Sequence, residues 1–184
     1  MAGSNEVLLV RHGETDDNAA ARFQGHIDTP LNDRGREQSR ALAETLAGEG
    51  VRALYSSPLA RARETAEIIG ARLGLQPVLD PRLMEADAGA WAGRLSSEII
   101  ADDANAFAAW RARAPGFRIP GGESVDEQAT RVAAALLDIG AGPLPALVVT
   151  HGGAIRAVDG IDAPGGAVAN CELFRVPAPV VVGP

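Results

Sequence analysis

The sequence has little of what marks a secreted, membrane-spanning or disulfide-stabilised protein. A single cysteine, Cys171, excludes an intramolecular disulfide and is typical of a reducing compartment. Apolar runs such as residues 7–10 and 146–149 fall far short of the ~20 residues that cross a membrane as a helix. The N-terminal residues have no basic segment that leads into an apolar stretch, as a secretory signal would. We therefore expect a soluble cytoplasmic protein with no membrane partner.

Lysine is absent altogether. The 17 basic residues are all arginine, and 24 acidic residues give a net charge of −7. Without lysine the chain cannot form a Walker-type phosphate loop or a Schiff base. The acidic excess also makes nucleic acid an unfavourable partner. An anionic substrate would have to be attracted locally, by arginines whose planar guanidinium groups bind phosphate or carboxylate with two hydrogen bonds.

The 184 residues, of which 46% are hydrophobic and 22% charged, are typical of one globular domain with a sizeable core. No linker-like stretch divides the chain, so we expect a single domain over residues 1–184. Residues 83–122, rich in alanine, would form a small cap of short helices and loops, and the proline-rich residues 177–184 a flexible tail. The pattern of apolar residues predicts strands at 6–10, 52–56, 76–80, 146–150 and 170–176, and helices at about 32–48, 58–74 and 124–138.

Two helix starts carry explicit capping signals. Ser57 and Pro58 would be the N-cap and the first residue of one helix. Ser124 and Glu127 have the spacing of a capping box. Strands that alternate with helices favour an α/β fold, a three-layer α/β/α sandwich whose sheet is mostly parallel. In such sheets ligands bind beyond the carboxyl ends of the strands.

Two of the three histidines follow apolar strands directly. Residues 6–10 run into Arg11, His12 and Gly13, and residues 146–150 run into His151 and a glycine pair. Both histidines should emerge at the same edge of the sheet and face each other if the two strands are neighbours. A histidine at a strand end is as often a packed polar residue, but two together, each followed by glycine, indicate a site.

An arginine and a glutamate are expected at the same edge. Arg61 lies near the start of a helix that follows a strand, although such an arginine, taken alone, is more often a solvated residue, here paired with Glu64 or Glu67. Glu85 follows the third predicted strand among apolar and small residues. These neighbours could desolvate the carboxyl group and raise its pKa.

These residue types are the parts that metal-free phosphoryl transfer requires. Two guanidinium groups and an imidazolium would neutralise phosphoryl oxygens, a neutral imidazole would attack phosphorus, and a carboxylic acid would protonate the leaving oxygen. A metal site is the competing use of histidine and acidic residues. Its usual spacings, His-Glu-x-x-His and Cys-x-x-Cys, are missing, so no metal is expected.

Five ordered blocks of residues resemble the histidine phosphatase superfamily, also called phosphoglycerate mutase-like. The first is RHGET at residues 11–15, with Asn18 and the Phe-Gln-Gly of residues 23–25 following. The others are residues 56–66 (SSPLARARETA), residues 83–93 around Glu85 and Trp91, residues 120–124 (PGGES), and residues 148–153 (VVTHGG). Together they span residues 7 to about 158, and the ordered set is highly specific.

The resemblance implies a role for each matching residue. His12 would be the nucleophile that forms a phosphohistidine, and Glu85 the acid that protonates the leaving group and later takes a proton from water. Arg11, Arg61 and His151 would form the phosphate pocket. Asn18 and the backbone near Gly152 would assist them, and Gln24 and Gly25 would line the substrate pocket. The family fold is the three-layer sandwich expected above, and no cofactor is implied.

The resemblance leaves three functions open. Bisphosphoglycerate-dependent mutases carry a longer middle insertion and adjacent arginines for a second acidic group, which here only Arg111 and Arg113 faintly resemble. We therefore favour a phosphomonoesterase acting on a small phosphorylated metabolite over a phosphoglycerate mutase. A non-catalytic phospho-ligand binding module is disfavoured because His12 and Glu85 are both present. The substrate and the oligomeric state remain open, as does the role of the short segment after His151.

Overall fold

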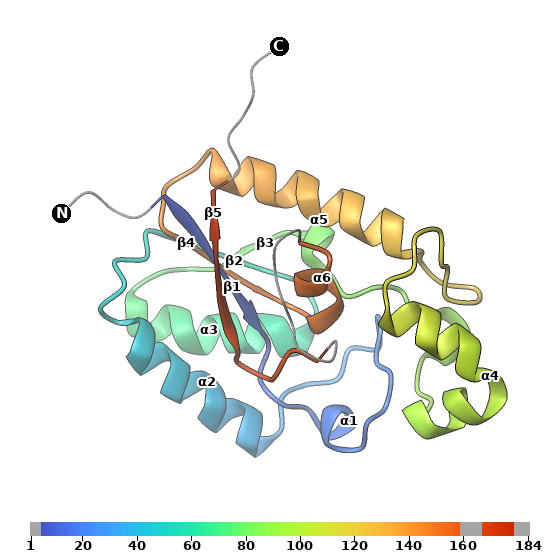
Figure 1. Cartoon of the computed structure of the whole chain (residues 1–184). Coiled ribbons are helices and arrows are strands. Elements are labelled where there is room, and N and C mark those ends of the chain that lie inside the picture. Colours follow the sequence, from blue (N-terminus) through green and yellow to red (C-terminus); the bar gives the residue numbers. More distant parts are fainter. Residues whose placement is uncertain (1–4, 159–166, 179–184) are drawn as a thin grey trace, which may run out of the picture.

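The computed structural model describes residues 5–158 and 167–178. These residues form a sheet with helices on both faces, in which strands and helices alternate along the chain (Figure 1). The elements are β1 Glu6–Arg11, α1 Asp16–Ala19, α2 Asp33–Leu46, β2 Ala53–Ser56, α3 Ala60–Leu73, β3 Val78–Leu79, the 3-10 turns η1 Pro81–Leu83 and η2 Gly89–Trp91, α4 Ser96–Arg111, α5 Val125–Gly140, β4 Ala146–Thr150, α6 Gly152–Arg156 and β5 Leu173–Pro177.

The sheet is mostly parallel, as the sequence predicts. Its strand order is β3-β2-β4-β1-β5 within the described residues. The strands β3, β2, β4 and β1 pair in parallel, whereas β5 pairs with β1 antiparallel. In the central pair Arg11 lies opposite Thr150. Because the two strands are parallel and end in register, the residues that follow them emerge side by side at one edge.

Two apolar clusters enclose the sheet and explain its three layers. Along β1, Leu8 and Val10 pack with α2 and α3 on one face, and Val7 and Leu9 pack with α5 and α6 on the other. All four side chains are buried. A strand that is apolar on both faces is what a sheet covered on both sides requires. Figure 1 shows α2 and α3 on one side of the sheet, and α5 and α6 on the other.

Of the two predicted helix caps, the structure confirms one and shifts the other. Ser124 and Glu127 form the capping box at the start of α5, as predicted. The prediction for α3 is wrong by two residues, because this helix begins at Ala60 with Leu59 as its N-cap. Ser57 still accepts a hydrogen bond from the Leu59 N–H at 3.3 Å. The Ser-Pro pair therefore lies in the turn before the helix.

The middle segment has an apolar cluster of its own. Trp91 and Ile99 are buried there, and Phe23 from the N-terminal loop lies edge-on to Trp91 with ring centroids 5.4 Å apart. Helix α4 contains a break at Asp103, whose φ of −153° is not helical. Two short helical pieces joined by a break match the one or two short helices expected from the sequence.

The last strand reaches into the segment predicted as a tail. Strand β5 extends to Pro177, and Ala178 is buried and donates its backbone N–H to the Asn5 carbonyl. Residues 179–184 lie outside the described part of the chain.

The loop after β1 crosses the start of α2 in close backbone contact. A Cβ atom on Gly35 would lie 2.1 Å from the Glu14 carbonyl oxygen, and one on Gly13 would lie 2.5 Å from the Gly35 carbonyl oxygen. No side chain fits between these two segments. The glycines therefore set how closely the loop that contains His12 can approach α2.

This contact predicts that Gly35→Ala destabilises the protein although Gly35 lies in a helix, where alanine is normally the better residue. We expect the free energy of unfolding to fall by about 1–3 kcal/mol because the new methyl group overpacks the crossing. Urea denaturation measures this loss. Gly48→Ala is the matched control, since a Cβ atom there meets nothing within 4 Å. Equal stability of the two variants would contradict the prediction.

Candidate active site

The two strand-end histidines lie together, as the sequence predicts. His12 follows β1, and its backbone N–H donates to the Thr150 carbonyl at 2.9 Å, next to His151 at the end of β4. The imidazole rings are 5.1 Å apart between centroids and inclined at 59°. Both side chains are buried. The pairing of β1 with β4 thus brings residues 139 positions apart in the sequence into one site.

The His12 ring is oriented by its neighbouring backbone. Its Nδ1 atom lies 2.7 Å from the Gly13 carbonyl oxygen, which can only accept, so Nδ1 carries the proton. Burial first, and then the positive charges of Arg11 and Arg61, hold the pKa of His12 well below its ordinary value. The ring is therefore neutral, with the lone pair on Nε2. A neutral imidazole with a free Nε2 is the form that can attack phosphorus.

His151 is also neutral in this structure. Burial holds its pKa well below the ordinary value, and Arg61, His12 and Arg11 lower it further. The imidazolium expected during phosphoryl transfer therefore stays a prediction about the substrate-bound site. The Nε2 atom contacts the Ser57 hydroxyl at 2.8 Å, and the buried Nδ1 atom has no hydrogen-bond partner in the described part of the chain.

Arg61 is buried at the site rather than solvated. It is 1% exposed, and it donates to the carbonyl oxygens of Gly25 at 2.8 Å and Ile27 at 2.9 Å. Burial lowers its pKa to about 10. The alternative pairing of Arg61 with Glu64 is not formed, because Glu64 accepts from Arg36 at 2.6 Å. A buried guanidinium held only by carbonyl oxygens keeps most of its positive field for an anion.

Arg11 lines the same cavity and is held in the same way, by a backbone carbonyl. It donates to the Val168 carbonyl, and burial lowers its pKa. The Nε atoms of both Arg11 and Arg61 are buried and lack a hydrogen-bond partner among residues 5–158 and 167–178. Buried donors in proteins are almost always paired. Two such unpaired donors on neighbouring guanidinium groups therefore suit an anionic ligand.

A cavity of about 240 Å³ opens beside His12. Most of the predicted site residues line it: Arg11, His12, Asn18, Gln24, Gly25, Arg61 and Glu85. The rest of the wall consists of Ala21, Arg22, Phe23, Ala86, Ala88, Ser96, Trp110 and Ile119. Neither His151 nor Gly152 is among the lining residues. His151 packs against the His12 ring, and a Cβ atom on Gly152 would lie 3.7 Å from Arg11 Nε.

Three of the predicted binding residues are constrained in different ways. The Gln24 side chain is buried, and its Oε1 atom has no partner within the described residues. Gly25 has a positive φ of 52°, and a Cβ atom there would lie 2.5 Å from the Ala88 Cβ, so only glycine fits. Asn18 belongs to the capping box of α1, where its Oδ1 atom accepts from the Thr15 backbone N–H at 3.2 Å.

Glu85 lies in the same cavity with its carboxylate held by three donors. Oε1 accepts from the Ala86 backbone N–H at 2.9 Å and from Gln128 Nε2 at 3.0 Å, and Oε2 accepts from the Gly153 backbone N–H at 3.1 Å. Burial, the largest influence, acts to raise the pKa of Glu85. These hydrogen bonds and the charge of Arg61 outweigh burial, and the pKa lies below its ordinary value. The expected raised pKa is therefore wrong for this structure.

Sequence reasoning missed three residues that hold the site. Ser57 contacts His151, and Gln128 contacts Glu85. Thr65 accepts from the Gly13 backbone N–H at 3.0 Å and donates to the Arg61 carbonyl at 2.8 Å, which links the loop after β1 to α3. Each lies within or next to a block that the sequence analysis singled out. Their roles depend on contacts between blocks, so sequence spacing does not reveal them.

Within the described ranges, 5–158 and 167–178, the structure has neither a candidate metal site nor a helix that could span a membrane. No group of three or more histidine, cysteine, aspartate or glutamate side chains there could hold a metal ion. No helix there is long and apolar enough to cross a membrane.

Comparison with known proteins points to one family. A family model described as histidine phosphatase superfamily (branch 1) matches residues 7–160. A Photorhabdus laumondii protein named as a probable phosphoglycerate mutase, GpmB, is 38% identical over 187 residues, covering 93% of this chain and 84% of that protein. Phosphoglycerate mutase-like protein 4 of Arabidopsis thaliana is 42% identical over 158 residues, which cover 83% of this chain and 69% of that protein.

Solved structures with the same fold include phosphatases. A mycobacterial glucosyl-3-phosphoglycerate phosphatase in complex with VO3 has a TM-score of 0.82 and 33% identity, and the match covers 92% of this chain and 91% of that one. YhfR of Bacillus stearothermophilus has a TM-score of 0.76 and 33% identity, and the match covers 83% of this chain and 77% of that one.

The neutral buried histidines predict a pH-dependent stability. In the folded protein the pKa of His12 lies well below 6.5, whereas in the unfolded chain it is near 6.5. This contribution is complete above pH 6.5 and is lost as the pH falls, because the unfolded chain takes up a proton that the folded protein excludes. We expect a loss of about 1.4 kcal/mol per pH unit for this one histidine below pH 6.5.

Urea denaturation of wild type and His12→Gln between pH 7.5 and 5 in phosphate-free buffer measures this loss. The wild type should lose more stability on acidification than the variant, which has no titrating group at this position. Parallel stability curves would contradict the prediction.

Proposed function

This chain belongs to the histidine phosphatase superfamily, and from that premise we propose that it is a metal-independent phosphomonoester hydrolase acting on a small phosphorylated metabolite. The observation that carries the proposal is the neutral His12 ring, which has its Nε2 lone pair free and lies in a cavity lined by Arg11, Arg61 and Glu85. These groups supply a nucleophile, a positive anion pocket and a proton donor.

In the first step, Nε2 of His12 attacks phosphorus, so that a P–N bond forms while the bond from phosphorus to the ester oxygen breaks. The leaving oxygen takes a proton from Glu85. Arg11 and Arg61 stabilise the charge on the phosphoryl oxygens. In the second step, Glu85 takes a proton from water, whose oxygen attacks the phosphorus of phospho-His12. As the new P–O bond forms, the P–N bond breaks and its electron pair returns to Nε2, so inorganic phosphate leaves and His12 is again neutral with the proton on Nδ1.

The low pKa of Glu85 is compatible with this role. A phosphate group bound between Arg11 and Arg61 adds negative charge close to the carboxylate, and a nearby like charge raises the pKa of an acid. The same charge favours protonation of His151. Glu85, which is ionised, and His151, which is neutral, would therefore each take up a proton when the substrate enters.

A mutase is the second candidate, since relatives such as the Photorhabdus protein are named as probable mutases. A mutase needs cationic side chains for a second acidic group. Arg113 is committed elsewhere, because it donates to Gln128 Oε1, the Gly153 carbonyl and the Val125 carbonyl at 3.1–3.2 Å. Arg22 also lines the cavity, but it donates to the Gly93 carbonyl and lies 3.7 Å from the Asp17 carboxylate, and the wall further includes Phe23 and Trp110. These observations favour hydrolysis over phosphoryl transfer to a second acidic substrate.

Further elements of the proposal concern the surroundings of the site. Residues 83–122 would act as a cap that selects the substrate, because Glu85, Trp110 and Ile119 from this segment line the cavity. The acidic composition and single cysteine support a cytoplasmic protein that does not bind nucleic acid. A non-catalytic phospho-ligand binding module remains the contrasting hypothesis.

The nucleophile assignment predicts that His12→Ala abolishes hydrolysis of p-nitrophenyl phosphate without added metal, while vanadate inhibits the wild type. We expect the fold to remain intact, which circular dichroism verifies. Activity of the variant within a few-fold of wild type would refute His12 as the nucleophile. Phosphate binding without any turnover in the wild type would favour the binding module.

The acid assignment predicts a dependence on the leaving group. Glu85→Gln should lower kcat/KM by about 100-fold or more for an alkyl phosphate, and much less for p-nitrophenyl phosphate, whose leaving group needs little protonation. Equal losses on both esters would remove Glu85 from the acid role.

A further inference from the structure

Glu85 lies in a segment with no regular backbone structure of its own. It falls between η1 and η2, where no helix or strand hydrogen bonds fix residues 85–87. A catalytic acid must nevertheless be held within a fraction of an ångström of its productive position. Its backbone must therefore be positioned by groups from elsewhere in the fold.

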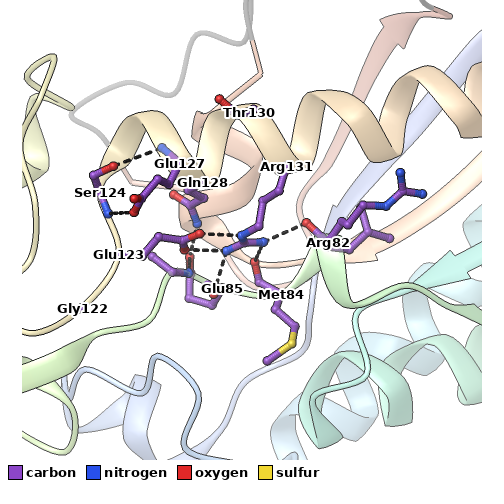
Figure 2. A network of polar contacts seen from close by, with 12 residues as sticks. Arg82, Met84, Glu85, Gly122, Glu123, Ser124, Glu127, Gln128, Thr130 and Arg131 are labelled. Atoms are coloured by element: carbon purple, nitrogen blue, oxygen red, sulfur yellow. Dashed lines mark hydrogen bonds and ion pairs between the residues drawn. The ribbon is translucent and has the colours of Figure 1, made fainter.

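A single guanidinium group from α5 binds this segment. Arg131 NH1 donates to the carbonyl oxygens of Arg82 at 2.8 Å and Met84 at 2.7 Å, and NH2 donates to the Glu85 carbonyl at 3.0 Å (Figure 2). Three carbonyl groups within four residues thus converge on one side chain. The Glu85 carbonyl also accepts from His26 Nε2 at 2.9 Å.

The guanidinium is itself held in one orientation. Both carboxylate oxygens of Glu123 accept from Arg131, from Nε and from NH2, each at 2.7 Å. With these two bonds all five N–H donors of Arg131 are used. Both side chains are largely shielded from water, with 22% of the Arg131 and 15% of the Glu123 side chain exposed. A bidentate, shielded pair of this kind is geometrically specific.

The same helix also contacts the carboxylate. Gln128 lies three residues before Arg131, hence on the same face of α5, and its Nε2 atom donates to Glu85 Oε1. Figure 2 shows Gln128 and Arg131 projecting from α5 towards the Glu85 segment. One helix face therefore contacts both the backbone and the side chain of Glu85.

We propose that Arg131, oriented by Glu123, is a positioning residue that holds Glu85 where it can transfer protons in the reaction. This inference rests on the proposed function, since it gives Glu85 the acid role. Arg131 does not bind the phosphate itself, because its donors are committed and it does not line the cavity beside His12. Lysine cannot replace it, since an ammonium group has three donors and lacks the planar arrangement that reaches three carbonyls and a carboxylate.

The test compares Arg131→Lys with wild type on two esters. We expect kcat/KM for an alkyl phosphate to fall by about 10- to 100-fold, the size of effect that a misplacement near 1 Å produces. For p-nitrophenyl phosphate the fall should be less than about threefold, because its leaving group needs little protonation. Inhibition by inorganic phosphate should stay within about threefold of wild type, since Arg11 and Arg61 are untouched.

Arg72→Lys is the matched control. Arg72 on α3 likewise pairs with a carboxylate, Glu44 at 2.9 Å, but it does not line the cavity beside His12 or contact residues 82–85. This variant should keep wild-type kcat/KM on both esters. Glu123→Gln, which weakens the orientation of Arg131, should show a smaller loss with the same preference for the alkyl ester.

A double variant separates positioning from general stabilisation. If Arg131 acts through Glu85, Glu85→Gln/Arg131→Lys should be no slower on the alkyl ester than Glu85→Gln alone, because effects of residues that act as a unit are not additive. Additive losses, or equal losses of Arg131→Lys on both esters, would overturn the inference. If Glu85→Gln alone shows no leaving-group dependence, the proposed acid role fails, which is a distinguishable result.

Amide hydrogen exchange provides a readout that needs no turnover. The Ala86 and Gly153 N–H groups donate to the Glu85 carboxylate, so both should exchange faster in Arg131→Lys than in wild type. The amides of β4 should exchange at the wild-type rate. Unchanged protection of Ala86 and Gly153 would also overturn the inference.

Discussion

The parallel pairing of β1 with β4 is the constraint on which the rest of the site depends. The two strands are central, apolar on both faces and in register, so their last residues end at one level of the sheet. His12 and His151 then emerge within contact distance of each other. A shift of one residue in this register would turn the side chains of one strand to the opposite face and separate the rings. The burial of β1 between two apolar clusters makes such a shift costly.

The electrostatics of the site follow from burying arginines without acidic partners in contact. Arg11 and Arg61 are held by carbonyl oxygens, so their charge is oriented but not neutralised. That charge, together with burial, keeps both histidines neutral, and the charge of Arg61 helps to keep Glu85 ionised. A doubly charged phosphate group bound there, as we propose, would oppose each of these effects through its own negative charge. Both the positive charge of the site and the shape of its cavity therefore suit an anionic ligand.

Much of the site is held by hydrogen bonds from side chains to loop backbone. Thr65 binds the loop after β1, and Arg131 binds the segment that contains Glu85. Loops have no ladder of their own hydrogen bonds, so the groups that hold them must come from helices that are already fixed by the core. Different elements therefore position different parts of the site. The sheet places the histidines, and α3 and α5 place the loops that complete the cavity.

The sequence alone predicts the fold class, the strands and the main helices, and it indicates the five residues expected to carry the chemistry. It could do so because apolar periodicity is local, and because a strand end in a parallel sheet predicts where the next residue lies. The sequence could not assign charge states. The pKa of Glu85 depends on donors from Gly153 and Gln128, which lie far along the chain, and burial alone suggested the opposite shift.

The tertiary structure alone decided which contacts hold the site. In the sequence, Arg61 matches the phosphate pocket of the family and Arg113 faintly resembles an arginine for a second acidic group. In the structure Arg61 lines the cavity, whereas Arg113 binds carbonyl and amide oxygens of the framework. Arg131 carries no motif that separates it from a solvated helix residue. The physical reason is common to these cases. The role of an arginine is set by the acceptors that surround its guanidinium, and those acceptors are brought together only when the helices pack on the sheet.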